Sequence, residues 1–156
     1  MRVITTALLA LIVSAVHSQV PAQQLKIVDS FENVVTTGLK KYLIKKDTGH
    51  LALAKNQTAS YQKQFFIDRS TKSLHMVTYL RMFNNGMLIN ETYYYLNNKP
   101  LSAYRIKQPR KKAMQEETYY FYNDQTYNHA DSTVLKPINE IKSSAESFLT
   151  QYKKFK

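Results

Sequence analysis

The chain of 156 residues has no cysteine and only three glycines, and both shortages exclude classes of function. Without cysteine the protein cannot form a disulfide, a thiolate metal site, a thiol nucleophile or a lipid anchor on an N-terminal cysteine. The glycines, Gly38, Gly49 and Gly86, lie far apart in the sequence. This spacing excludes a glycine-rich phosphate loop and a dinucleotide-binding fingerprint.

Recognisable catalytic and metal-binding motifs are also lacking. Beyond residue 18 the histidines are His50, His75 and His129, and no two of them stand three or four residues apart. The chain has no Gly-x-Ser-x-Gly elbow that would present a serine nucleophile. We therefore predict no metal site, no cofactor and no catalytic residue. Enzymatic activity stays undecided, but these observations favour a non-enzymatic function.

The first 18 residues have the order of an export signal. Met1-Arg2 carries positive charge, residues 3–16 are apolar, and small residues follow them. We predict a signal peptide over residues 1–18, cleaved after Ser18 or Ala22, and a single domain over residues 19–156 in the periplasm or outside the cell. The apolar run is shorter than the roughly 20 residues that span a bilayer, so no transmembrane segment is expected in the mature chain. Because it lacks disulfides, such an exported domain fits a bacterial protein.

A repeated aromatic motif predicts consecutive antiparallel strands. Residues 91–98 read Glu-Thr-Tyr-Tyr-Tyr-Leu-Asn-Asn, and residues 117–124 read Glu-Thr-Tyr-Tyr-Phe-Tyr-Asn-Asp. Each copy has high β propensity and ends in residues suited to tight turns, and Asn85-Gly86 is a strong hairpin signal. The short connections between such runs predict a meander. Five strands are expected at residues 61–67, 74–83, 87–96, 101–107 and 114–122, with a sixth at 126–130.

Apolar residues at helical spacing predict one helix before the meander and one after it. The first stripe covers residues 27–43, and four lysines between residues 40 and 46 suit its C-terminal end. A hairpin that turns at residues 47–49 is the competing interpretation. The second stripe covers residues 138–155; its end, residues 149–156, packs on the sheet or, alternatively, lies in a membrane interface. The predicted fold is α+β, an antiparallel meander of 5–6 strands with both helices packed on one face.

Aromatic residues stand on both faces of the predicted strands, more than one helix-covered face requires. Basic residues lie beside them on a neighbouring strand and in the turn at residues 108–112. Rings beside cations suit sugars, bases, phosphates and carboxylates, so we predict a ligand-binding face. Its residues are Tyr93, Tyr95, Tyr119, Arg105, Lys107, Arg110, Lys111 and Lys112. The alternative is that the tyrosines form packing within the sheet and that the turn is merely solvated.

Residues 93–99 and 120–125 resemble strand–turn units of small exported bacterial proteins and, more distantly, the aromatic hairpin repeats of bacterial antitoxin-like proteins. The resemblance implies hairpins. It carries over no residue role and no activity.

The formal net charge of +11 indicates attraction to anionic partners. We expect an exported, non-enzymatic binding domain that engages an anionic polymer or an acidic protein, and nothing indicates sequence-specific recognition of nucleic acid. One alternative is a hydrolase or lyase of envelope polymers that uses Glu91, Glu117 and His75. The two glutamates are, however, expected to pair with Arg105 or Lys107 across strands. The other alternative is an inhibitor or immunity-type protein directed against a secreted enzyme.

Overall fold

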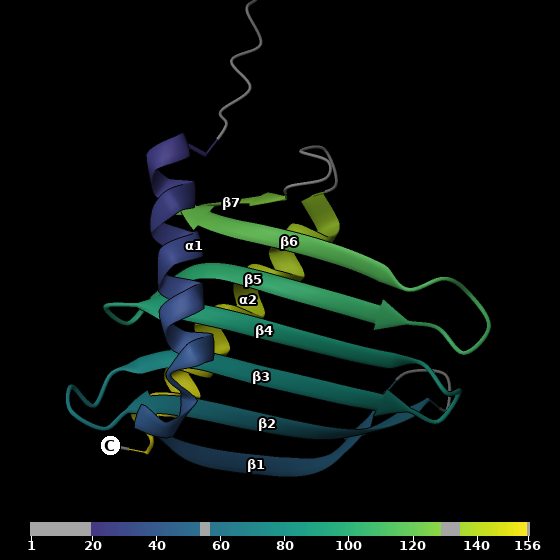
Figure 1. Cartoon of the computed structure of the whole chain (residues 1–156). Coiled ribbons are helices and arrows are strands. Elements are labelled where there is room, and N and C mark those ends of the chain that lie inside the picture. The colour runs from purple at the N-terminus through teal and green to yellow at the C-terminus, as the bar shows by residue number, and fades with distance from the viewer. Residues whose placement is uncertain (1–19, 54–56, 129–134, 156) are drawn as a thin grey trace, which may run out of the picture.

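The structure is a computed structural model that describes residues 20–53, 57–128 and 135–155, with the backbone alone at residues 135–137. Seven antiparallel strands lie between two helices, which confirms the predicted α+β meander with one strand more than the largest predicted number. The strands follow one another across the sheet in chain order (Figure 1). The elements are α1 (Ala22–Thr37), a 3-10 helix (Leu39–Lys41), β1 (Tyr42–Ala52), β2 (Thr58–Asp68), β3 (Leu74–Phe83), β4 (Leu88–Leu96), β5 (Lys99–Gln108), β6 (Gln115–Tyr122), β7 (Gln125–Asn128) and α2 (Leu135–Lys153).

The additional strand is β1, and it begins inside a segment that the sequence predicts as helix. α1 ends at Thr37, and Gly38 donates its N–H to the carbonyl of Val34. Thr36 and Thr37 donate their hydroxyls to carbonyls four residues earlier. Such bonds compete with the helix ladder and weaken the last turn. The predicted helix over residues 27–43 is therefore wrong beyond Thr37.

The competing hairpin at residues 47–49 is also wrong, because these residues lie inside β1. Asp47 pairs with Lys63 of β2, and Gly49 pairs with Tyr61. A Cβ at Gly49 would approach the ring of Tyr61 to 2.9 Å, so the glycine makes room for a neighbouring ring and does not form a turn. The connection between β1 and β2 includes residues 54–56, which lie outside the described residues.

The two copies of the aromatic repeat adopt the same strand-and-turn structure. Asn97 and Asn98 follow β4 with φ values of 53° and 57°, and Asn123 and Asp124 follow β6 with φ values of 50° and 60°. Two consecutive left-handed residues form the hairpin turn that matches the twist of antiparallel strands, and Asn and Asp tolerate this conformation. The tight turns predicted at the end of each copy are confirmed.

The two helices lie on opposite faces of the sheet, which corrects the prediction that both pack on one face. In Figure 1, α1 lies in front of the sheet and α2 behind it. Neighbouring residues of a strand point to opposite faces. Phe65 therefore belongs to the core under α2 and Phe66 to the core under α1, and Tyr93 and Tyr94 divide in the same way. Each face has its own helix, and this explains the aromatic residues on both.

The core under α2 is the larger of the two. The apolar stripe of α2 is buried, with Ile141, Ala145 and Phe148 at most 3% exposed. Phe148 packs its ring edge-on against three aromatic rings of the sheet, those of Phe65, Tyr79 and Tyr93. Truncating a buried phenylalanine of this kind costs about 3–5 kcal/mol. On the other face, α1 buries Val28 and Val35.

Two predicted segments fall outside the described residues. The signal peptide over residues 1–18 is one, and residues 129–130 at the end of the predicted sixth strand are the other. The described part of that strand is β7. Among the described helices, none has the length and apolar character needed to cross a membrane.

Candidate binding site

The tyrosines of the predicted ligand-binding face are buried, which corrects that part of the prediction. Tyr93, Tyr95 and Tyr119 all have 0% exposed surface in the core under α2. Burial raises the pKa of each of the three hydroxyls. Tyr95 donates its hydroxyl to the carbonyl of Ala145 at 3.1 Å. α2 covers these rings, so they serve the core and are closed to a ligand.

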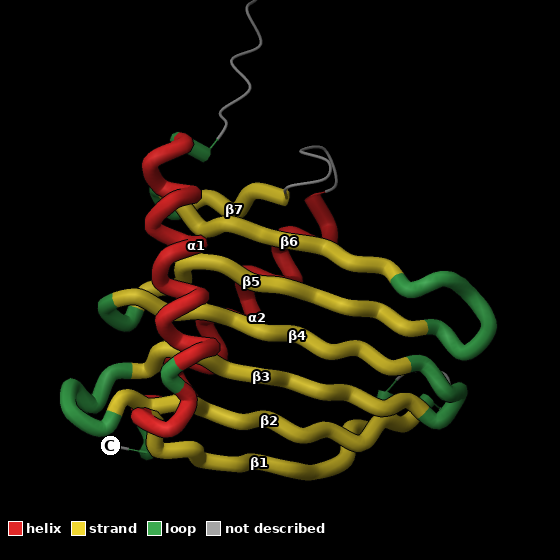
Figure 2. The backbone as a smooth tube through the Cα atoms, in the orientation of Figure 1, coloured by secondary structure: helices red, strands yellow, loops and turns green. Residues whose placement is uncertain are grey.

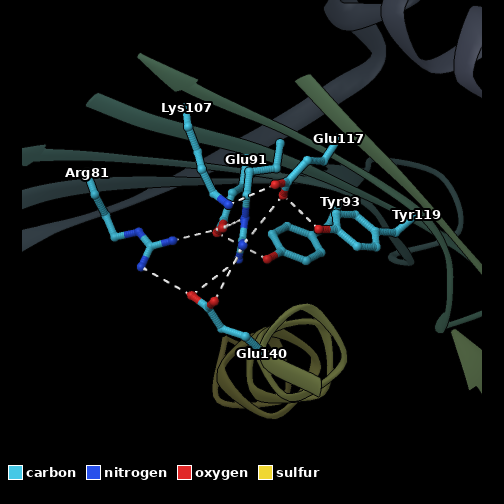
Figure 3. Close-up of polar contacts among 8 residues, drawn as sticks. Arg81, Glu91, Tyr93, Lys107, Glu117, Tyr119 and Glu140 are labelled. Carbon is cyan, nitrogen blue, oxygen red and sulfur yellow. Dashed lines mark hydrogen bonds and ion pairs between the residues drawn. The ribbon is translucent and has the colours of Figure 1, made fainter. Parts of the chain in front are cut away.

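Arg105 and Lys107, also predicted site residues, belong to an ionic cluster between the sheet and α2 (Figure 3). Glu91 is at its centre. One carboxylate oxygen of Glu91 lies 2.6 Å from Nε of Arg105 and 2.8 Å from Nη2 of Arg81. The other oxygen accepts a hydrogen bond from Tyr93 at 3.1 Å. Arg105 is 2% exposed and Glu91 0%, so the predicted cross-strand pairing of Glu91 is confirmed as a buried ion pair.

Two further glutamates complete the ionic cluster. Glu117 lies 2.8 Å from Nζ of Lys107 and accepts a hydrogen bond from Tyr119 at 2.7 Å, as its predicted pairing requires. Glu140, on α2, lies 3.2 Å from Nη2 of Arg105. The cluster therefore connects the central strands of the sheet to the helix that covers them.

Two members of the ionic cluster, Glu117 and Arg105, have their charged forms favoured by their neighbours. Burial alone would raise the pKa of Glu117, but hydrogen bonds from Lys107 and Tyr119 bring it below its usual value. Burial alone would lower the pKa of Arg105, and the negative charge of Glu91 raises it above its usual value. The cluster contains Arg81, Arg105 and Lys107 against Glu91, Glu117 and Glu140. Because the two signs balance, this cluster is suited to holding the fold together and not to attracting a charged ligand.

The histidine of the hydrolase alternative lies on the opposite face of the sheet. The ring of His75 packs edge-on against Phe31 and Tyr42, and its Nδ1 lies 3.1 Å from the hydroxyl of Tyr42. Burial lowers the pKa of His75. The sheet separates this histidine from Glu91 and Glu117, so the fold does not bring the three together. Within the described part of the chain, no group of three or more histidines and carboxylates is placed to hold a metal ion.

The predicted basic turn is exposed, but it stands apart from the tyrosines. Arg110, Lys111 and Lys112 lie in the connection between β5 and β6. Arg110 rests against the β3–β4 turn, where a Cβ at Gly86 would come within 2.9 Å of its side chain. Five of the predicted site residues therefore lie on the face of the sheet that α2 covers, the three tyrosines in the core and Arg105 and Lys107 in the ionic cluster, whereas residues 110–112 lie in a surface turn.

A second basic surface forms where three distant segments meet. Residues 39–46, 69–72 and 153–155 lie together at the start of β1, the β2–β3 turn and the end of α2 (Figure 2). We call the exposed basic residues of these segments the basic corner. They are Lys40, Lys41, Lys45, Lys46, Arg69, Lys72, Lys153 and Lys154. The three segments contain no acidic residue, and among the described residues none of these cations forms an ion pair.

Hydrogen bonds to the backbone hold the three segments against one another. Arg69 donates its backbone N–H to the carbonyl of Lys41 and its Nε–H to the carbonyl of Tyr42, both at 3.3 Å. Near the end of α2, Tyr152 donates its hydroxyl to the carbonyl of Lys72. The fold itself therefore brings the cations of the basic corner together.

Asp68 organises the turn that carries two of the corner cations. Its Oδ1 accepts hydrogen bonds from the hydroxyl and N–H of Ser70 and from those of Thr71. These bonds lower the pKa of Asp68. Lys72 takes a positive φ of 56° before β3 begins. The carboxylate of Asp68 is thus directed into the turn, and that of Asp47, which directly follows Lys46, pairs with Lys63.

A pocket of about 380 Å³ opens at the basic corner. Its lining residues are Leu43, Lys45, Ile67, Lys72, Tyr152 and Phe155. Large apolar side chains are also exposed here: Leu39 (44%), Leu43 (41%), Ile44 (42%) and Phe155 (42%). The corner therefore combines positive charge with apolar surface, which suits a partner that has both an anionic and an apolar part.

A second pocket, along α1, lacks this combination. It is an open groove of about 420 Å³, lined by Gln23, Lys26, Ile27, Ser30, Phe31, Val34 and Leu96. Lys26 is the basic residue of this lining, so positive charge is sparse there. The charge of the protein therefore favours the corner over the groove as the site of an anionic partner.

Sequence reasoning missed the basic corner because its segments are far apart in the chain. The available signal is the run Leu-Lys-Lys-Tyr-Leu-Ile-Lys-Lys at residues 39–46, which mixes apolar and basic residues. Helical spacing assigns the lysines of residues 39–46 to the end of the first predicted helix. It assigns the lysines near residue 153 to the end of the second predicted helix. No local pattern shows that the start of β1 and the end of α2 meet.

No protein-family model matches this chain, and comparisons with curated proteins and with solved structures find no match either.

Proposed function

We propose that the protein is a small, exported, non-enzymatic binding domain that recognises an anionic partner through its basic corner. The observation that carries the proposal is the way the fold divides its charges. The ionic cluster neutralises its own cations, whereas the eight cations of the basic corner are exposed and without an ion-pair partner among the described residues. Exposed cations gathered at one site attract anions beyond contact distance and accelerate their association.

Other observations support binding over catalysis. Both carboxylate oxygens of Glu91 are occupied by donors of the protein, and His75 lies across the sheet from it. The formal net charge of +11 agrees with an anionic partner. The order of charged, apolar and small residues over residues 1–18 supports the export part of the proposal.

Charge reversal tests the basic corner against the basic turn. The corner variant is Lys45→Glu with Lys72→Glu, and the matched control is Lys111→Glu with Lys112→Glu. Both variants change the net charge equally, and all four side chains are exposed, so both should fold. Binding to heparin, used as a soluble polyanion, is measured by calorimetry at low and high salt. Circular dichroism checks that each variant keeps its β structure.

We expect the corner variant to bind heparin at least about tenfold more weakly than the wild type, and the turn variant to stay within about twofold. Binding by the wild type should weaken steeply as salt is added, because exposed charges are screened. Equal losses in the two variants would show that net charge alone drives binding. A loss confined to the turn variant would return the site to residues 110–112.

A further inference from the structure

We infer that the anionic partner is the surface of a membrane containing anionic lipids, and that the basic corner docks the domain against it along the edge of the sheet. The inference rests on the proposed function and specifies its partner. It is carried by the apolar side chains that stand among the corner cations.

Exposed apolar side chains are concentrated at the basic corner. Of the nine large hydrophobic side chains that are exposed among the described residues, four lie there: Leu39, Leu43, Ile44 and Phe155. A soluble polyanion offers no apolar surface against which these side chains could pack. The boundary between lipid headgroups and acyl chains takes up cations and apolar groups together. Lysine suits this boundary because its apolar stem can lie among acyl chains while its amine stays with the phosphates.

Side-chain direction along β1 distinguishes a flat surface from a ligand inside the pocket. Leu43 pairs with a residue of the core under α2, and Ile44 pairs with a residue of the core under α1. The two side chains therefore project to opposite faces of the sheet, as those of Lys45 and Lys46 do. The pocket is lined by Leu43 and Lys45 and not by their neighbours. A bilayer that meets the sheet edge-on can contact all four.

The position of β1 makes this edge accessible. β1 is the terminal strand of the sheet, and Figure 1 shows no described element along its outer side. Phe155 lies close by, because its ring centroid is 5.1 Å from that of Phe65 in β2 while 42% of the residue stays exposed. Leu39 precedes β1 directly in the 3-10 helix. The apolar groups and the cations are thus gathered around the beginning of one edge strand.

The basic turn between β5 and β6 supplies an internal comparison. It carries an exposed apolar residue, Met114 (55% exposed), beside Arg110, Lys111 and Lys112. Figure 1 shows this connection at the other end of the sheet from the start of β1. A flat surface in contact with the basic corner would therefore not reach the turn. Substitutions at the turn are matched controls for those at the corner.

Vesicle binding tests the inference with the full chain. Co-sedimentation is measured with phosphatidylcholine vesicles that contain or lack phosphatidylglycerol. Because the apolar residues 3–16 can associate with any bilayer, the quantity compared is the ratio of binding to anionic over neutral vesicles. The variants are Lys45→Glu with Lys72→Glu, Ile44→Ser, and the control Met114→Ser. Heparin binding is measured in parallel for each of them.

We expect the wild type to prefer anionic vesicles at least tenfold, and we expect each reversed lysine to reduce that preference by about fivefold or more. Ile44→Ser should weaken binding to anionic vesicles about three- to tenfold while leaving heparin binding unchanged. Met114→Ser should change neither vesicle binding nor heparin binding. If Ile44→Ser does not fold, Leu39→Ser, outside the strand ladder, should show the same separation between vesicles and heparin.

Other results would overturn the inference in distinguishable ways. Heparin binding at the corner without a preference for anionic vesicles would reject the membrane and leave the proposed function standing. Failure to bind either probe would reject both. Vesicle binding that is lost in Leu43→Ser and unchanged in Ile44→Ser would place a single lipid in the pocket and reject edge-on docking.

Discussion

The ionic cluster under α2 and the basic corner contain the same kinds of side chain in opposite circumstances. In the cluster, Arg81, Arg105 and Lys107 each face a carboxylate, and Arg105 is 2% exposed. At the corner, eight cations are exposed and have no ion-pair partner among the described residues. Charges of the first kind join the sheet to its helix, and charges of the second kind remain available to a partner. Composition alone does not distinguish them.

The ionic cluster should contribute to stability, and the basic corner should contribute to binding. Disturbing the cluster should change the free energy of unfolding and leave anion binding unchanged in molecules that still fold. Disturbing the corner should weaken anion binding and should not lower the free energy of unfolding. Variants of either region that lower both the free energy of unfolding and anion binding would erase the distinction between the two regions.

The largest expected effect is the loss of Glu91. Glu91→Ala removes the carboxylate that pairs with Arg81 and Arg105, and it leaves a buried guanidinium with fewer partners. We expect the free energy of unfolding, measured in urea, to fall by about 3–5 kcal/mol. The control is Glu146→Ala, an exposed glutamate of α2, which should stay within about 0.5 kcal/mol of the wild type. A loss below about 1 kcal/mol for Glu91→Ala would show that the cluster is not a unit of stability.

A smaller effect of the opposite sign is expected at the basic corner. Like charges repel one another in the folded state, so replacing several of them should stabilise the fold. With Lys40, Lys41, Lys45 and Lys72 all changed to glutamine, we expect the free energy of unfolding at low salt to rise by about 1 kcal/mol. The gain should shrink in high salt, because screening already reduces the repulsion. A loss of stability at low salt would show that these lysines have partners within the fold.

The smallest expected effect is the pH dependence contributed by Glu117. Burial opposes its ionisation, but Lys107 and Tyr119 outweigh burial and lower its pKa below the reference value of 4.5. The ionised carboxylate therefore stabilises the fold at pH above the unfolded pKa, and this contribution is lost as the pH falls through the lower folded pKa. The free energy of unfolding is measured in urea at about pH 6 and about pH 3. The difference between the two values should be smaller in Glu117→Gln than in the wild type, by about 1 kcal/mol or less. A larger difference in the variant than in the wild type would contradict the lowered pKa of Glu117.

Local patterns predicted most of the meander because its determinants are close together in the chain. The aromatic repeat ending in Asn97-Asn98 and Asn123-Asp124 encodes both a strand and the turn that reverses it. The pairing of Glu117 with Lys107 follows from adjacent strands joined by a short connection. The helical stripe of α2 was visible from residues 138–155 for the same reason.

Predictions failed where two structures compete for the same local pattern. Residues 39–46 carry apolar residues at a spacing that fits a helix, yet β1 gains a ladder with β2 along its whole length, from Tyr42 opposite Asp68 to Ala52 opposite Thr58. A tertiary partner outweighs the weak preference of a short segment. The predicted tyrosine face failed differently. Alternation showed that Tyr93 and Tyr94 point apart, but it could not show that a helix covers each face.

Local sequence patterns account for the strands after residue 57, their turns and the second helix, because each depends on residues a few positions apart, and composition accounts for the excess of positive charge. Three features come from tertiary packing: the helices take opposite faces, Arg105 is neutralised under α2, and residues 39–46, 69–72 and 153–155 form one corner. These features depend on contacts between segments far apart in the chain. Such contacts form only when the two helices pack on the opposite faces of the sheet, so no local pattern records them.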